Sequence, residues 1–223
     1  MGHDVSMTGV SLARGGGGRY HVGGHGVALR EEALLNITCE PITPETARLL
    51  AAWRYPAPYE TYNIGDEPAA LAEMLDARSP WFVAFDYDPE DATSADGVAR
   101  EREPMGYCCF GTSAEVGWTG DPRLWTTDDQ TLSVGLGMRP DLTGQGLGLS
   151  FFEAVLDFAA QRFSPTAFRL FVLPFNQRAI NVYERAGFRQ IGERVVRVGS
   201  PDELLFLEMR RNASKRSAGQ TTP

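Results

Sequence analysis

The segment from residue 131 to residue 161 constrains this chain most, because an apolar strand runs through a glycine turn directly into an amphipathic helix. Gly144, Gly146 and Gly148 lie where the turn meets the helix. They carry no Cβ, so a ligand can come close to the main chain. The first turn of a helix presents backbone N–H groups without intrahelical partners, and together with the helix dipole these attract anions. The segment therefore predicts a site for a phosphorylated ligand.

Composition narrows the class of protein. The chain has 223 residues, of which 43% are hydrophobic and 22% are charged, as is typical of one soluble globular domain. Its net charge of −8 disfavours nucleic acid as a partner. An acidic surface favours cationic substrates such as amines, although solubility is the simpler interpretation. No apolar run is long enough to cross a membrane, and the N-terminus has no secretory apolar region, so we expect no membrane partner.

The composition also divides the chain into three parts. Residues 1–32 are rich in Gly, His and Arg and predict a disordered extension, residues 33–211 predict the folded domain, and residues 212–223 predict a disordered polar tail. All three histidines lie in the extension, so a catalytic triad, a Cys–His dyad or a histidine-bearing zinc site would have to recruit it, and we expect no metal. The three cysteines do not form a disulfide framework; buried, reduced thiols suit a cytoplasmic location.

Within the folded part, strands and helices are mixed without strict alternation. The hydrophobic patterns predict strands over residues 35–39, 81–86, 105–113, 131–139, 168–173, 190–198 and 202–210. They predict helices over residues 43–53, after residue 66, and over residues 144–161 and 176–186. Residues 88–103 predict a solvated loop. The mixture indicates an α+β (mixed α/β) sheet layered with helices rather than a doubly wound fold.

A second motif gives the glycine turn a context. Alone, the turn matches neither a dinucleotide fingerprint nor an NTPase phosphate loop, because Leu149 takes the place of the third glycine and no Gly-Lys-Ser/Thr follows. After the strand at 168–173 comes Asn176-x-x-Ala179-x-x-x-Tyr183-x-x-x-Gly187-Phe188. Together the two motifs resemble the GNAT superfamily of acyl-coenzyme A-dependent N-acyltransferases. The resemblance covers roughly residues 35–210 and implies a central mixed, mostly antiparallel sheet of six to seven strands flanked by about four helices.

The resemblance implies a binding site for acetyl-CoA, which would serve as a co-substrate. The family loop reads Arg/Gln-x-x-Gly-x-Gly/Ala, and here Gly146 and Gly148 fill the small positions while Thr143 stands at the first. The Thr143 hydroxyl can still donate a hydrogen bond, so we expect weakened rather than lost binding. Asn176 would contact the pantetheine arm, and a backbone N–H within residues 136–138 would polarise the thioester carbonyl. The residues that we expect to contact the coenzyme are Leu136, Gly137, Met138, Thr143, Gly144, Gln145, Gly146, Leu147, Gly148, Leu149, Asn176 and Ala179.

By the same resemblance, Tyr183 would protonate the departing thiolate. A phenol with a pKa of ~10 can donate to a thiolate of comparable basicity, whereas the alternative is that Tyr183 only packs on the core. The sequence leaves the general base open among a water chain and four acids, Glu60, Glu115, Asp128 and Asp129, each of which also suits a solvated surface. Tyr55, Tyr59 and Tyr62 lie where the family shapes its acceptor pocket, so they predict either cation–π contacts to an amine or burial as core.

We therefore expect a cytoplasmic N-acetyltransferase that moves an acetyl group from acetyl-CoA to a primary amine of a small molecule or a protein. The amine would attack the thioester directly, because Cys108 and Cys109 lie in a strand without an activating histidine. A non-catalytic acyl-CoA-binding or sensor module of the same fold is the alternative, and a longer acyl group is a second. A homodimer is compatible with the sequence, which does not define the acceptor, the acyl chain or the oligomeric state.

Overall fold

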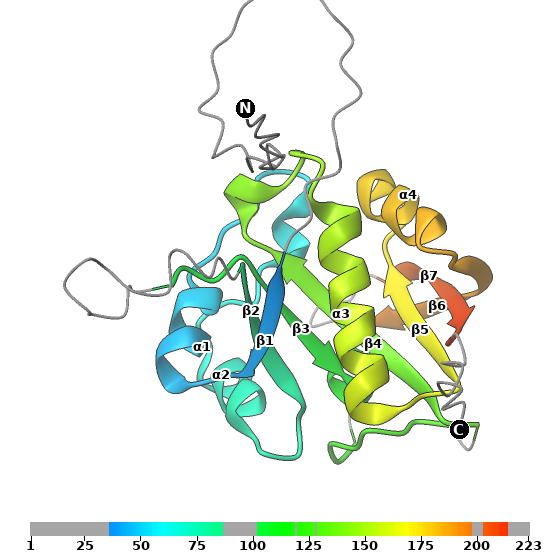
Figure 1. Cartoon of the computed structure of the whole chain (residues 1–223), viewed down its shortest axis with the longest axis horizontal. Helices are drawn as coiled ribbons and strands as arrows, with labels where there is room; N and C mark the ends of the chain where they lie inside the picture. The colour runs from blue at the N-terminus through cyan, green and yellow to red at the C-terminus, as the bar shows by residue number, and fades with distance from the viewer. Residues whose placement is uncertain (1–35, 87–101, 119, 128, 198–202, 214–223) are drawn as a thin grey trace, which may run out of the picture. The chain divides into compact units, whose positions relative to one another are not determined.

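A computed structural model describes residues 36–86, 102–118, 120–127, 129–197 and 203–213, all of which belong to the unit Glu32–Pro223 (Figure 1). The expected extension over residues 1–32 lies outside the described residues, as do most of the expected loop at 88–103 and most of the expected tail. No helix of the described part is both long and apolar enough to cross a membrane. Cys39, Cys108 and Cys109 all carry free thiols.

The described residues form one sheet in the strand order β1-β2-β3-β4-β5-β7-β6. Its strands are β1 (Ile37–Pro41), β2 (Trp81–Asp86), β3 (Gly106–Phe110), β4 (Thr131–Met138), β5 (Ala167–Val172), β6 (Arg189–Arg197) and β7 (Glu203–Asn212). Every neighbouring pair is antiparallel except β4 and β5, which run parallel. This arrangement confirms the mixed, mostly antiparallel sheet that the sequence predicts.

Four α-helices accompany this sheet in the described part: α1 (Pro44–Ala51), α2 (Pro68–Leu75), α3 (Gly148–Phe163) and α4 (Gln177–Arg185). α1 begins where the sequence predicts, because Thr43 caps it and exchanges hydrogen bonds with Thr46. The larger core lies under α3, where Phe151 and Phe152 are fully buried. A smaller core joins α1 and α2 to Tyr107 of β3. Because side chains alternate along a strand, neighbouring residues of β3 serve different cores.

Several boundaries differ from the sequence prediction by one to four residues, and glycine conformation explains the two that matter for the site. The helix expected from residue 144 begins only at Gly148, because Gly144 and Gly146 have φ angles of +77° and +86°, which a right-handed helix cannot contain. The strand expected over residues 105–113 ends at Phe110, because Gly111 turns the chain with a φ of +66° into the short helix η2 (Gly111–Ala114). The first correction leaves the backbone of residues 143–147 as a turn between the end of β4 and the start of α3.

Candidate active site

The sheet opens between its two parallel strands. β4 and β5 pair only where Thr131, Leu132 and Ser133 meet Ala167, Phe168 and Arg169. Beyond that point β4 stays paired with β3 up to Met138, while β5 stays paired with β7. A cavity of about 620 Å³ is lined by the separated parts of both strands. Backbone groups of β4 that face this gap are therefore free to hydrogen-bond an extended ligand.

The glycine loop lies at one end of the cavity. We call this loop, together with the adjoining start of α4, the loop side. The residue before α3, Leu147, provides no side-chain cap, and the first turn of α3 contains no acid. Its backbone N–H groups therefore remain available to an anion. Thr143 behaves differently from the expectation, because its hydroxyl already donates a 2.7 Å hydrogen bond to the Pro140 carbonyl. A single hydroxyl proton cannot serve both partners.

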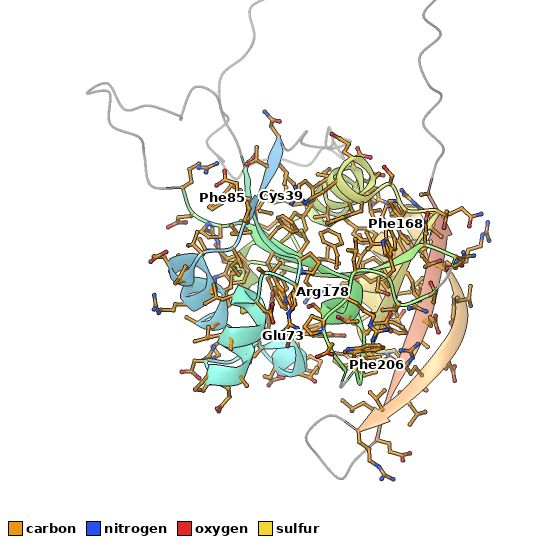
Figure 2. All side chains as sticks on the ribbon, turned by 90° about the horizontal axis from the view of Figure 1, so that it is seen from below. Cys39, Glu73, Phe85, Phe168, Arg178 and Phe206 are labelled. Atoms are coloured by element: carbon orange, nitrogen blue, oxygen red, sulfur yellow. The ribbon has the colours of Figure 1, made fainter. Side chains whose placement is uncertain are left out.

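The guanidinium of Arg178, on α4, brings a positive charge to the loop side. Arg178, labelled in Figure 2, lines the cavity, and its Nη1 lies 3.7 Å from the position that a Cβ on Gly144 would occupy. Its guanidinium lies over the Tyr59 ring at 4.3 Å. No carboxylate within the described residues pairs with it. Sequence reasoning missed Arg178, although a basic residue in the first turn of the helix that carries Tyr183 was an available signal.

The second motif brings its polar groups to the same cavity. Asn176 caps α4, with its Oδ1 accepting a 3.2 Å hydrogen bond from Ala179 N–H, and its side chain lies beside the Tyr62 hydroxyl. Tyr183 lines the cavity, and its ring packs 4.9 Å from Phe152. No described group hydrogen-bonds to the Tyr183 hydroxyl. Burial raises the pKa of Tyr183 well above its ordinary value, so the phenol keeps its proton at neutral pH.

Most of the twelve expected coenzyme contacts line this cavity, and the exceptions are Gln145 and Leu147. The Gln145 side chain is exposed and donates a 2.7 Å hydrogen bond to the Asp141 carbonyl. A family motif marks these positions through backbone spacing, so it does not determine where the intervening side chains point.

The rest of the cavity wall, which we call the aromatic side, collects side chains from distant segments. They are Tyr55, Tyr59, Tyr62, Trp81, Tyr107, Glu115, Phe171 and Phe206. Tyr55 donates a 2.8 Å hydrogen bond to the Met138 carbonyl, and burial raises its pKa to about 12. Tyr62 accepts a 3.3 Å hydrogen bond from Leu173 N–H. The tyrosines that the sequence singled out are half-buried cavity walls.

Tyr107 is a wall that sequence reasoning did not find. It pairs in register with Gly137 of β4, and its ring occupies the space that a side chain at Gly137 would need. The Trp81 ring stacks on it, with centroids 5.4 Å apart and planes at 28°. Burial raises the pKa of Tyr107 well above its ordinary value. The signal that could have found it is the glycine in β4, since a glycine inside a strand often marks the close approach of another group.

Glu115 is the one candidate base among the described residues that lines the cavity. It forms ion pairs with Arg169 and, at 2.8 Å, with Arg194, and its side chain is only 3% exposed. Burial favours a higher pKa, but the Ser133 hydroxyl and the two guanidiniums outweigh it and hold the pKa of Glu115 below its ordinary value. A carboxylate so held is a poor proton acceptor.

The remaining candidate bases lie elsewhere. Asp129 accepts hydrogen bonds from Thr127 and Thr131 and pairs with Arg210 at 3.1 Å, away from the cavity lining. Glu60 is exposed and does not line the cavity, and Asp128 lies outside the described residues. Within the described part, no group of three or more His, Cys, Asp or Glu could hold a metal ion.

Comparison with known proteins agrees with this geometry. A family model described as an acetyltransferase (GNAT) domain matches residues 37–189. A Vibrio cholerae spermidine N-acetyltransferase, solved with CoA and spermine, is similar with a TM-score of 0.56 at 14% identity, over 79% of this chain and 95% of that one. The aminoglycoside acetyltransferase AAC(6')-Ib, solved with coenzyme A, gives 0.52 at 20% identity over the same shares. A search of curated proteins finds no match. At these identities the solved structures establish the shared fold.

Proposed function

The chain belongs to the GNAT acetyltransferase family, and from that premise we propose that it transfers an acetyl group from acetyl-CoA to a primary amine. The observation that carries the proposal is the gap between β4 and β5. It joins free strand backbone, an anion-binding helix start and a half-buried phenol in one cavity. A thioester at the end of a long phosphorylated arm needs these three features in this order.

The loop side suits the coenzyme. Left-handed Gly144 and Gly146 leave the main chain open, and the uncapped N–H groups of α3 would hold the pyrophosphate. Arg178 would supply the positive charge that Thr143 lacks, because its guanidinium lies beside the loop. Backbone groups within residues 136–138 would pair with the pantetheine arm as an added strand does. The two solved relatives were both captured with coenzyme A, which supports this assignment.

The chemistry would be direct transfer. The amine nitrogen attacks the thioester carbonyl carbon, the C–S bond breaks, and the phenol of Tyr183 gives its proton to the departing sulfur. A backbone N–H of β4 would stabilise the negative charge that develops on the carbonyl oxygen. Tyr183 suits the acid role because its hydroxyl lines the cavity and has no competing partner in the described residues. Burial makes the phenol a weaker acid, so its transfer requires that the departing thiolate is desolvated in the same cavity and made more basic in turn.

We propose that water, rather than a side chain, accepts the proton of the incoming ammonium. Support comes from Glu115, the one acid among the described lining residues, which is occupied by two arginines. We also propose a cytoplasmic location, which the three free thiols support.

An isotope experiment tests the proposal. Purified protein is incubated with deuterated acetyl-CoA and either a panel of amines or a cell lysate, and mass spectrometry follows the label. We expect label on primary amines, and a comparison with succinyl-CoA reports the acyl preference. Tight binding of acetyl-CoA without transfer to any amine would instead identify a non-catalytic acyl-CoA-binding module.

A further inference from the structure

The net charge of the described cavity wall is positive, whereas that of the whole chain is negative. The chain carries a net charge of −8, yet the charged residues described on the wall are Arg178, Arg185 and Glu115. Arg178 lies at the loop side, beside Gly144. Glu115 is thus the one carboxylate that the described aromatic side could offer to a cation.

Glu115 is not available to a ligand. Oε1 takes the Arg169 guanidinium together with the hydroxyls of Ser133, at 2.5 Å, and Thr126, at 3.2 Å. Oε2 takes Arg194 Nη1 at 2.8 Å. Both oxygens of a 3% exposed side chain therefore already have charged partners. A ligand ammonium at Glu115 would therefore have to share the carboxylate with two guanidiniums that already pair with it.

The aromatic rings of the cavity are also partly occupied by cations. Arg169 lies 5.5 Å and Arg194 lies 4.4 Å from the centroid of the Phe171 ring. Arg178 lies over Tyr59 at 4.3 Å. A ring that already holds a guanidinium gains little from a second cation, because the two like charges repel each other. What the wall offers instead is apolar and aromatic surface, including Trp81, Tyr107 and Phe206.

We propose that the acceptor is a monoamine whose body is uncharged, apolar and ring-bearing, and that polycationic amines are excluded. The inference rests on the proposed acetyl transfer and names its substrate class. Among the described residues that line the cavity, none offers a free carboxylate, so bringing a second ammonium against this part of the wall costs desolvation that these residues do not repay. An apolar ring, in contrast, gains free energy in proportion to the area that it buries against these walls. The two solved structures concern other amines: one was solved with spermine, and the other is an aminoglycoside acetyltransferase.

A matched substrate panel tests the proposal on the full-length protein. Initial rates of CoA release are compared for phenethylamine, spermidine and kanamycin at fixed acetyl-CoA. We expect kcat/KM for phenethylamine to exceed both others about 100-fold, since discrimination here rests on unpaired charge. Equal or faster transfer to spermidine or kanamycin would overturn the inference while leaving acetyl transfer established.

A second experiment removes one of the two arginine partners of the Glu115 carboxylate. Arg194→Met frees Oε2 of Glu115, so the ratio of kcat/KM for spermidine to that for phenethylamine should rise about tenfold. Arg194→Lys keeps the charge and should leave the ratio near the wild-type value. Arg197→Met is the matched control, because Arg197 lies on the same strand in an exposed pair with Glu203. A ratio that responds equally in both Met variants would contradict the proposal.

A binding measurement separates failure of this inference from failure of the proposed function. The CoA-loaded protein, which cannot turn over, is titrated with phenethylamine and with spermidine. If no amine is acetylated, the proposed function fails, while tighter binding of phenethylamine still supports the cavity assignment. Tighter binding of spermidine, or binding of neither amine, overturns the cavity assignment.

Discussion

The loop side of the cavity is built mainly from backbone, whereas the aromatic side is built from side chains. One contiguous stretch supplies the end of β4, two left-handed glycines and the start of α3, and α4 adds Arg178 and Tyr183. The aromatic side draws on the segment between α1 and α2, on β2 and β3, and on β5 and β7. The same gap between β4 and β5 serves both sides.

This difference separates what must stay fixed from what can change. Backbone N–H groups bind phosphate in nearly any sequence that keeps the dihedral angles, so the loop side depends on a few glycines. Side chains on the aromatic side can be exchanged without disturbing strand pairing. The Vibrio cholerae enzyme, which was solved with CoA and spermine, shares the fold at 14% identity.

The largest expected effect is on turnover and concerns the proton donor. Tyr183→Phe removes the hydroxyl but keeps the ring that packs on Phe152. We expect kcat to fall about 10²–10⁴-fold, as for loss of a general acid, while the Kd of acetyl-CoA changes little. Steady-state rates and equilibrium titration measure the two quantities. A kcat close to that of the wild type would show that the loop side binds the coenzyme without supplying the proton.

The next effect is on stability and concerns the buried ion pairs of the aromatic side. Glu115→Ala leaves Arg169 and Arg194 without their shared partner, and we expect a loss of about 3–5 kcal/mol in the free energy of unfolding. Glu203→Ala is the control, since it removes a carboxylate from an exposed pair and should cost about 1 kcal/mol or less. Urea denaturation distinguishes the two, and equal losses would contradict the assignment.

The same carboxylate gives a pH dependence with a defined sign. The pKa of Glu115 is lower in the folded protein than in the unfolded chain, so its contribution is complete above the ordinary Glu pKa. That contribution is lost as the pH falls through the lowered folded value. The stability gap between wild type and Glu115→Gln should therefore be constant above the ordinary Glu pKa and shrink as the pH falls below it. A gap that widens on acidification would refute the ion-pair explanation.

A smaller effect is expected at the glycine loop. Gly146→Ala places a Cβ at a φ of +86°, which costs about 1–2 kcal/mol unless the loop shifts, so acetyl-CoA should bind about 5–30-fold more weakly. Gly65→Ala is a close control, because Gly65 has a φ of +77°, open space around it and no place in the cavity wall. It should show similar strain with unchanged binding. Equal loss of binding in both variants would remove the special role of the loop.

The contrast between the two sides also explains what the sequence could predict. The strand positions and the α4 motif follow from local patterns, and the structure confirms the mostly antiparallel sheet that the family resemblance implies. Arg178, Tyr107 and the pairing of Glu115 did not follow, because each depends on partners distant in sequence. Glu115 meets Arg169 across 54 positions and Arg194 across 79. Single-sequence spacing carries no information on such contacts, whereas a glycine turn and its helix lie within one stretch.

The central claim is that the two sides of the cavity do separate work, and a crossed measurement on two variants tests it most directly. Arg178→Ala alters the loop side, and Phe206→Ala truncates a buried ring of the aromatic side. We expect Arg178→Ala to raise the Kd of acetyl-CoA about tenfold, because a charged hydrogen-bond partner is lost, and to change the Michaelis constant of phenethylamine much less, because its one described contact on the aromatic side is with Tyr59. Phe206→Ala should raise the Michaelis constant of phenethylamine about tenfold and leave the Kd of acetyl-CoA unchanged. If the Kd of acetyl-CoA and the Michaelis constant of phenethylamine rise together in both variants, the two sides of the cavity do not act separately.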